Sequence, residues 1–123
     1  LTQTKENKDE AGVSHDSIWL EKLEQTVTEH IENNDFKVSE LANLLLISER
    51  SLLQKTISHT GLTPSEYIKK ARLKMAFKLC KEGRVARLKE LTYAVGLKDP
   101  RRFSEAFERE YGVKLIDLIK ANT

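Results

Sequence analysis

The chain has 123 residues, enough for one small domain or two very small ones, and 39% of them are hydrophobic, which supplies a modest core. Two Pro and five Gly argue against a barrel or sandwich of many short strands, and no apolar run approaches the roughly 20 residues that span a bilayer. A single Cys excludes an intramolecular disulfide framework and a four-cysteine zinc site, and it fits a reducing, cytosolic setting. The chain begins with Leu1 rather than Met, which indicates a fragment of a longer protein.

Charge is divided unevenly along the chain. Residues 1–36 carry three Lys against nine Asp and Glu, a net charge of −6, whereas residues 37–123 carry eighteen Lys and Arg against ten Asp and Glu, a net charge of +8. A basic segment of this size is typical of a protein that binds a polyanion, and equally of an ordinary solvated helical surface. Charge alone leaves both interpretations open.

The first 35 residues predict a leader followed by one helix. Residues 1–15 are polar, with almost nothing to bury, and predict a linker or frayed leader. A helix is expected to begin near Asp16 or Ser17 and to end at the Asn-Asn-Asp cluster of residues 33–35. Its expected apolar stripe is Ile18, Leu20, Leu23, Val27 and Ile31.

Two short helices are predicted next. The first follows Ser39, and the second begins after Ser48, whose side chain is expected to cap it, and stops at Gly61. The apolar positions expected to be buried in this pair are Leu41, Ala42, Leu44, Leu45, Leu52 and Leu53.

A longer helix is predicted from Pro64 to Lys81, with Gly83 beyond its end. Thr63 and Glu66 have the spacing of a capping box, and Pro64 suits the first turn. Eighteen helical residues extend over roughly 27 Å. The expected buried stripe is Tyr67, Ile68, Ala71, Met75 and Leu79, with Cys80 beside it as a buried thiol.

The same order of elements recurs in the last third of the chain. A short helix over residues 88–95 is closed by Gly96, and the next begins with Asp99 as N-cap and Pro100 in its first turn and stops at Gly112. A last short helix completes an all-α fold of about seven helices, because no segment alternates as a strand does. The positions expected to be buried are Leu88, Leu91, Ala94, Val95, Phe103, Ala106, Phe107, Tyr111, Leu115, Leu118 and Ile119.

Residues 38–68 and 88–119 are two copies of one pattern. Each copy is a short helix, a tight turn, a second helix and a Gly stop, which is the helix-turn-helix pattern. The matched pairs are Leu41 and Leu91, Leu45 and Val95, Ser48 and Asp99, Leu52 and Phe103, Gly61 and Gly112, Glu66 and Asp117, and Ile68 and Ile119.

The second helix of such a unit presents its N-terminal turns to the DNA major groove, which is about 12 Å wide and admits a helix. Arg can form two hydrogen bonds with guanine, Gln can do the same with adenine, and Glu can accept from cytosine. One copy alone is more often an ordinary helix hairpin, whereas two copies with matching caps and stops favour DNA binding. The predicted DNA-binding residues are Arg50, Ser51, Gln54, Lys55, Lys98, Arg101, Arg102, Ser104, Glu105 and Arg109.

The two motifs resemble the DNA-binding domain of the AraC/XylS family of bacterial transcription regulators over roughly residues 16–121. The first copy matches through Gly61-x-Thr63-Pro64-x-x-Tyr67-Ile68 and Arg72-Leu73-x-x-Ala76, and the second through Gly96-Leu97-x-Asp99-x-x-x-Phe103-Ser104-x-x-Phe107 and Tyr111-Gly112. The resemblance implies two helix-turn-helix subdomains joined by one long helix, with adjacent major grooves bound on one face of the DNA. Residues 50–55 and the acidic leader resemble, more narrowly, the output domain of Bacteroidetes-type hybrid two-component regulators.

The departures from the family pattern concern packing first. Thr56 stands where the family usually has Phe, and Thr92 where it has Ala, so both positions are expected to alter the core. The connecting helix also carries Lys69, Lys70, Arg72, Lys74 and Lys78, and some of these side chains are expected to face DNA phosphates. Most are expected to be solvated, Lys74 and Lys78 among them.

The predicted organisation is a leader over residues 1–15, a first helix-turn-helix subdomain over 16–62, a connecting helix over 63–82 and a second subdomain over 83–123. The predicted function is sequence-specific binding of double-stranded DNA as the output module of a cytoplasmic transcription regulator. The expected partners besides DNA are RNA polymerase and a covalently attached upstream sensor or receiver domain, and this fragment is expected to make no membrane contact.

A helical adaptor that docks a protein through its acidic first helix, without binding DNA, is the alternative, and steep salt dependence distinguishes DNA binding from it. His15, His30 and His59 lack metal-ligand spacing. No Ser-His-Asp set, Gly-rich phosphate loop or paired-carboxylate pocket is recognisable in the sequence. We therefore expect no metal, no cofactor and no enzymatic activity.

Overall fold

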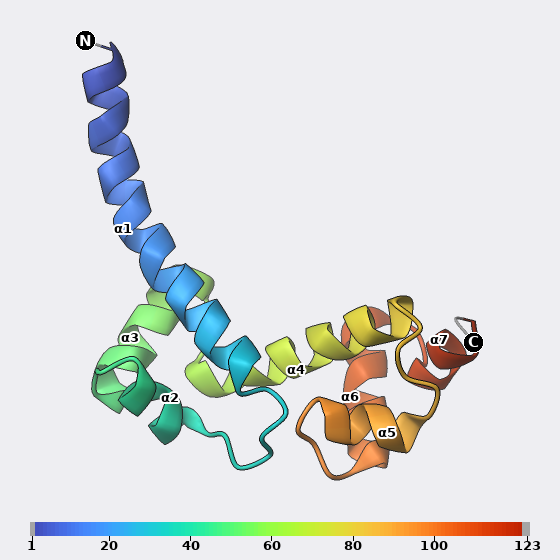
Figure 1. Ribbon diagram of the computed structural model, residues 1–123. Coiled ribbons are helices and arrows are strands. Elements are labelled where there is room, and N and C mark those ends of the chain that lie inside the picture. The colour runs from blue at the N-terminus through green and yellow to red at the C-terminus, as the bar shows by residue number, and fades with distance from the viewer. Residues whose placement is uncertain (1, 122–123) are drawn as a thin grey trace.

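The structure of the protein, a computed structural model, describes residues 2–121, and the side chains from Asp16 onward. Over this part of the chain it contains seven helices and no strand, which confirms the predicted all-α class (Figure 1). The helices are α1 (Thr2–Glu29), α2 (Val38–Leu44), α3 (Glu49–Thr60), α4 (Pro64–Lys81), α5 (Leu88–Ala94), α6 (Pro100–Tyr111) and α7 (Leu115–Ala121).

Helix α1 begins at Thr2, so the expectation that a helix starts near Asp16 is wrong. The polar residues 2–15 include Lys, Glu and Ala, which are good helix formers, and no Pro. Extending a helix that already exists is much easier than starting one, so a segment with only Ala11 and Val13 as apolar residues can continue it. Ile18 is exposed rather than part of the expected stripe, and burial in α1 begins at Leu23.

The first hydrophobic core lies among α1, α2, α3 and the beginning of α4. Leu44 and Leu53, which were expected to be buried, are exposed because they lie off the packed faces of α2 and α3. Thr56 is fully buried, and its hydroxyl donates a 2.6 Å hydrogen bond to the carbonyl of Leu52, so the core accommodates its polar atom. The buried hydrophobic residues of this core are Leu23, Val27, Ile31, Phe36, Leu41, Ala42, Leu45, Leu52 and Ile68.

The second core lies among the end of α4, α5, α6 and α7. Phe107 is fully buried, and its ring centroid lies 4.6 Å from that of Tyr111 and 6.2 Å from that of Phe77. Thr92 is also fully buried and donates to the carbonyl of Leu88 at 2.7 Å. The buried hydrophobic residues of this core are Leu73, Ala76, Cys80, Val85, Leu91, Val95, Phe103, Phe107, Leu115 and Ile119.

The predicted helix caps are confirmed. The Ser48 hydroxyl accepts from the backbone N–H of Ser51 at 3.0 Å, and Thr63 and Glu66 form the reciprocal bonds of a capping box at 3.2 and 2.9 Å. The Asp99 carboxylate accepts from the first turn of α6. Each cap satisfies N–H groups that a helix N-terminus leaves without partners, and so fixes where α3, α4 and α6 begin.

The turn between the two helices of each unit has the same backbone in both copies. Leu46 in the first and Gly96 in the second have positive φ, 60° and 78°, and each turn closes through bonds to carbonyls three and five residues earlier. A non-Gly residue is disfavoured in this conformation, and Leu46 holds it with its side chain 85% exposed.

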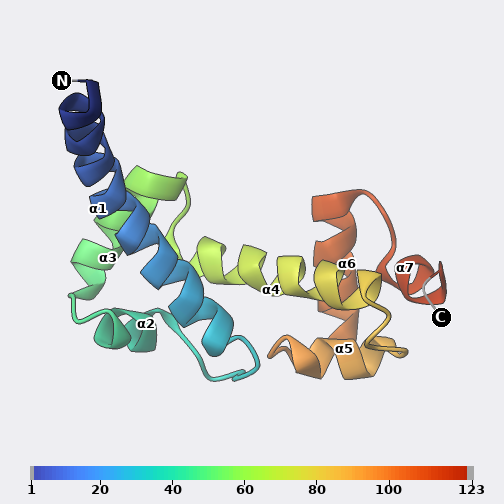
Figure 2. The ribbon, with the colours of Figure 1, turned by 45° about the horizontal axis from the view of Figure 1, so that its top comes forward.

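Helix α4 connects the two cores over the eighteen residues predicted for it (Figures 1 and 2). The expected buried stripe is only partly right, because Tyr67, Ala71, Met75 and Leu79 are half-buried. Cores lie against α4 at both of its ends, so its buried face shifts from one to the other along its length. The buried positions of α4 are Pro64, Ile68, Arg72, Leu73, Ala76 and Cys80.

Among the described residues, no helix has the length and apolar content that crossing a membrane requires.

Candidate nucleic-acid interface

Helices α3 and α6 are the matched second helices of the two units, and they lie toward opposite ends of α4 (Figures 1 and 2). Each has twelve residues, begins at a side-chain cap and ends at a glycine in the left-handed conformation. Each turns one face inward, with Leu52 and Thr56 buried on α3 and Phe103 and Phe107 on α6. The opposite face of each helix is open to solvent.

The open face of α3 carries Arg50 and Gln54, both exposed, as a major-groove contact requires. Ser51 is half-buried beside the cap. The ammonium nitrogen of Lys55 lies 5.5 Å from the ring centroid of Trp19, so this side chain extends along α1. Lys55 is therefore on the flank of α3 rather than at the centre of its open face.

Two apolar side chains on the same helix, Leu53 and Ile57, are exposed, which the sequence analysis did not predict: it expected Leu53 to be buried and did not single out Ile57. Leu53 and Ile57 are 41% and 45% exposed and lie one turn apart, between the buried stripe and the face that carries Arg50 and Gln54. The matching positions in α6 are Ser104 and Glu108, both polar, so the two open faces differ in chemistry. The comparison of the two repeats could have indicated their exposure, because the positions that match Leu53 and Ile57 in the second repeat are not core positions.

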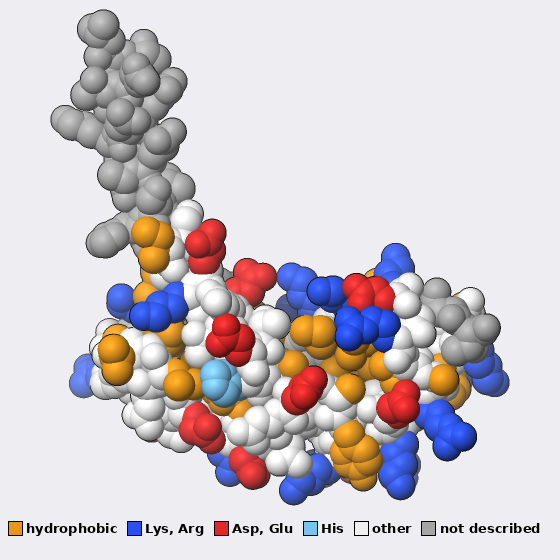
Figure 3. Space-filling model, viewed as in Figure 1, with side chains coloured by type: hydrophobic (Ala, Val, Ile, Leu, Met, Phe, Trp, Pro, Cys, Tyr) orange, Lys and Arg blue, Asp and Glu red, His pale blue; other side chains and the backbone are white. Residues whose placement is uncertain are grey.

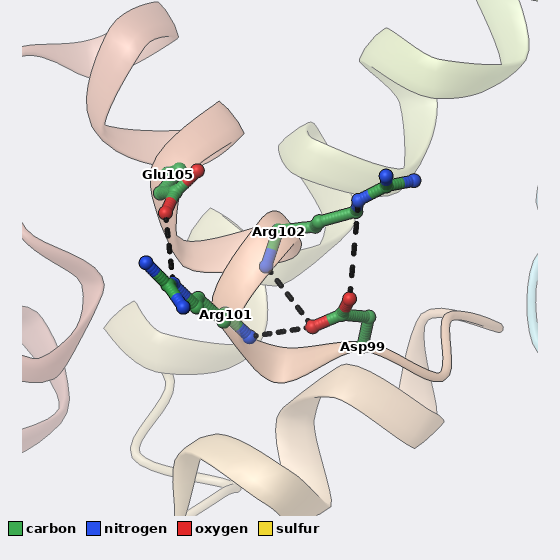
Figure 4. A network of polar contacts seen from close by, with 4 residues as sticks. All are labelled: Asp99, Arg101, Arg102 and Glu105. Carbon is green, nitrogen blue, oxygen red and sulfur yellow. Dashed lines mark hydrogen bonds and ion pairs between the residues drawn. The ribbon is translucent and has the colours of Figure 1, made fainter.

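The open face of α6 begins with two arginines. The side chains of Arg101 and Arg102 are 90% and 88% exposed and extend away from each other (Figure 4). The guanidinium of Arg101 lies 3.3 Å from the Glu105 carboxylate, and that of Arg102 lies 4.0 Å from Asp99 (Figure 4). Exposed ion pairs of this kind are worth about 0–1 kcal/mol, so both guanidinium groups can exchange their partners for DNA at little cost.

A groove of about 750 Å³ lies between the two units, beside α6. Its lining brings together four of the predicted DNA-binding residues, whereas Ser104 lies outside it, half-buried on α6. Six basic residues and two acidic ones line the groove, and all of the basic ones except the buried Arg72 are exposed, which favours a polyanion there. The exposed basic residues are Lys37, Lys69, Lys98, Arg102 and Arg109, and the acidic ones are Asp99 and Glu105.

Of the basic residues on the connecting helix, Arg72 faces neither phosphate nor solvent, because it is 6% exposed and its guanidinium donates to backbone carbonyls. Burial lowers the pKa of Arg72 below its ordinary value. The Lys70 ammonium is 3.3 Å from the Glu110 carboxylate, so it ties α4 to α6. Both Lys69 and Arg72 line the groove, but of these two only Lys69 is exposed.

Basic side chains are prominent over the C-terminal half of the molecule. In the view of Figure 3, Lys and Arg surround the end that holds α5, α6 and α7. This agrees with the net charge of +8 over residues 37–123.

The histidines have structural contacts. Ring nitrogens of His30 and His59 each lie 2.8 Å from a carbonyl one turn earlier, and His59 also lies 3.3 Å from the Asp16 carboxylate. His15 lies outside the residues with described side chains. Where side chains are described, no three His, Cys, Asp or Glu gather as a metal site would need.

Comparison with known proteins gives consistent matches. A family model described as a helix-turn-helix domain matches residues 41–120. The chain is 31% identical over 98 residues to histidine kinase P4 of Formosa agariphila, and 30% identical over 100 residues to the transcriptional activator RhrA of Rhizobium meliloti. Each alignment covers 80% of this chain, but only 7% and 32% of the two relatives, so the chain spans about a third of their length or less.

The fold has a close counterpart among solved structures. The C-terminal domain of AraT, a response regulator from Geobacillus stearothermophilus, superposes with a TM-score of 0.71 and 21% sequence identity. The alignment covers 82% of this chain and 83% of that domain. The arrangement of two units on one connecting helix is therefore shared with it.

Proposed function

Because the chain belongs to the AraC/XylS-type family of helix-turn-helix DNA-binding domains, we propose that α3 and α6 enter adjacent major grooves of one duplex and that the chain is the output module of a transcription regulator. One observation carries this proposal. Two capped helices with matching buried and open faces lie toward opposite ends of a single unbroken helix. Successive major-groove segments on one face of DNA are about 34 Å apart, and a helix of roughly 27 Å with the flanking units matches that separation.

The open faces supply the base contacts in this proposal. Arg50 and Gln54 from α3, and Arg101, Arg102 and Glu105 from α6, have the donors and acceptors that distinguish base pairs in the major groove. Leu53 and Ile57 offer apolar contacts to thymine methyl groups, because they flank Arg50 and Gln54 on the exposed side of α3.

Affinity comes from the phosphate contacts. Lys98 and Arg109 line the basic groove with Lys37 and Lys69, where one strand of the backbone passes between the two major-groove segments. Ser51, Lys55 and Ser104 lie at the edges of α3 and α6 and contact phosphates from there.

The wider role follows the named relatives. One is a histidine kinase and one a transcriptional activator, and the structural neighbour is part of a response regulator. We infer that an upstream sensor or receiver domain is joined through α1 and controls the two units. We also infer that the bound protein acts on RNA polymerase and that this takes place in the cytoplasm. In this organisation residues 16–62 and 83–123 are the two subdomains, and residues 63–82 join them.

Salt dependence tests the proposal against the adaptor alternative. Affinity for a duplex is measured by fluorescence anisotropy between 50 and 300 mM salt. The four groove residues Lys37, Lys69, Lys98 and Arg109, together with Lys55, make five contacts to phosphates and give a slope of log K against log salt of about −4 to −5. A matched variant with Lys69 and Arg109 changed to Gln should lose about two from that slope. A wild-type slope near zero, or no binding of duplex DNA, would favour the adaptor.

A further inference from the structure

Arg72 lies at the place where the two halves of the molecule meet. One terminal nitrogen of its guanidinium donates both to the carbonyl of Ile31, in the turn after α1, and to the carbonyl of Val95, the C-cap of α5. The other donates to the carbonyl of Asn33 at 3.3 Å. One side chain on α4 therefore binds backbone from the first unit and backbone from the second unit at once.

The acceptors suit a buried cation. Both Ile31 and Val95 follow the C-terminus of a helix, where carbonyl groups lack intrahelical partners and carry partial negative charge. Among the described residues, no carboxylate forms an ion pair with Arg72, so these carbonyls supply its compensation. The planar guanidinium directs several donors at fixed angles, which a lysine ammonium cannot reproduce.

Backbone from the two halves also makes a close approach at this point. Gly96 is buried directly after Val95, and a Cβ added to it would overlap both the Arg72 guanidinium and the Ile31 carbonyl oxygen. Elsewhere, the main helix contacts lie within one half or involve α4 itself. The orientation of one half relative to the other therefore depends on α4 and on this junction of Arg72, Gly96 and Ile31.

We propose that Arg72 is a positioning residue that holds the two helix-turn-helix units at one distance and angle, and thereby sets the half-site spacing that the protein accepts. This proposal rests on the proposed function, in which both α3 and α6 contact DNA. Inserting one base pair between half-sites moves one of them by about 3.4 Å and turns it by roughly 35°. A fixed junction cannot follow that change, whereas a loosened one can.

Two variants disturb the junction from opposite sides, and each has a matched control. Arg72→Met removes the donors, with Lys74→Met as its control because Lys74 is exposed on the same helix. Gly96→Ala forces the overlap, with Gly112→Ala as its control. Gly112 has a similar φ, 72° against 78°, and nothing within 4 Å of an added Cβ. Comparing Gly96→Ala with Gly112→Ala therefore separates the effect of the overlap at the junction from the backbone strain of a non-Gly residue at positive φ.

The first measurement needs no DNA. Spin labels at Ser58 on α3 and Glu108 on α6, both exposed, report the distance between the two units in a Cys80→Ala background. We expect a narrow distance distribution for the parent protein and both controls, and a broad or shifted one for Arg72→Met and Gly96→Ala. If Arg72→Met does not fold, Arg72→Lys takes its place, since it retains the charge without the planar fork.

The second measurement compares full sites, half-sites and full sites with one inserted base pair. The wild-type protein should lose at least tenfold in affinity on insertion, and Arg72→Met less than threefold, with its half-site affinity unchanged. The proposal would be overturned if Arg72→Met and Gly96→Ala keep both the narrow distance distribution and the wild-type spacing preference. It would also be overturned if the distance distribution of the control Gly112→Ala is as broad as that of Gly96→Ala. A wild-type protein with no preference for full sites would contradict the proposed function, and the spin-label distances would still decide the role of Arg72.

Discussion

Replacing Arg101 by Ala separates a base-contacting role from a structural one. In the free protein this exposed side chain interacts with Glu105, one turn along α6, and such a pair is worth about 0.3–0.5 kcal/mol. A bidentate contact between Arg and guanine is worth about 1–3 kcal/mol of discrimination, which corresponds to roughly 5- to 150-fold in affinity. The expected loss in binding therefore exceeds the expected loss in folding stability several-fold.

The assay is anisotropy at one fixed salt concentration, with four duplexes that differ at a single base pair beneath the start of α6. Wild-type protein should prefer one of the four, and Arg101→Ala should bind all four alike. Arg101→Lys is the matched control, because it keeps the charge but loses the bidentate geometry. Thermal unfolding should place wild-type protein and Arg101→Ala within about 0.5 kcal/mol of each other.

Two results would contradict a base-contacting role for Arg101 in different ways. If Arg101→Ala weakens all four duplexes equally and lowers the salt slope by about one, Arg101 contacts phosphate only. If it changes neither affinity nor preference, and Arg102→Ala also changes neither, α6 does not contact DNA and the two-helix account fails.

Three further predictions concern other parts of the chain. Replacing the contacted thymine by deoxyuridine removes one methyl group, worth about 0.8 kcal/mol, and should weaken binding of the wild-type protein roughly fourfold. Leu53→Ala and Ile57→Ala should each abolish this loss. Unchanged binding of the wild-type protein to the deoxyuridine duplex would refute the apolar contact. Phe107→Ala should lower the free energy of unfolding in urea by about 3–5 kcal/mol, because Phe107 is fully buried in the second core, and a loss below 1 kcal/mol would contradict that packing. Hydrogen bonds to the Lys55 carbonyl and the Asp16 carboxylate raise the pKa of His59, so protonated His59 stabilises the folded protein fully below pH 6.5, and this contribution is lost as pH rises through the folded-state pKa. Asp16→Asn should therefore flatten the fall in melting temperature between pH 6 and 8. Identical pH profiles for the two proteins would count against the His59–Asp16 pair.

The features predicted correctly from sequence are local. Ser48, Thr63 and Asp99 cap helices because a short polar side chain reaches an N–H two or three residues away, and this geometry needs no knowledge of the rest of the fold. The eighteen residues of α4 could be predicted for the same reason, from a capping box at one end and Gly83 beyond the other.

The features that sequence analysis missed depend on how the two halves meet. An arginine on a helix is usually exposed, but Arg72 is buried because its guanidinium donates hydrogen bonds to carbonyls 41 and 23 residues away in the chain. Leu and Ile are residue types usually found in a core, but Leu53 and Ile57 are exposed because Leu52 and Thr56 occupy the inward face of α3. The open-face positions Arg50, Gln54, Arg101, Arg102 and Glu105 follow from the repeat, whereas the basic groove, which includes Lys37, requires the placement of α2 and α6 around α4.

Selection of bound sequences from random duplex DNA shows whether α3 and α6 bind one duplex together, because it reports affinity, specificity and spacing in one experiment. We predict two enriched short motifs whose centres lie about 10–10.5 base pairs apart. A variant with Arg50 and Gln54 changed to Ala should lose one motif, and a variant with Arg101 and Arg102 changed to Ala should lose the other. Enrichment of a single motif, or of no sequence at all, would contradict the claim that α3 and α6 bind one duplex together.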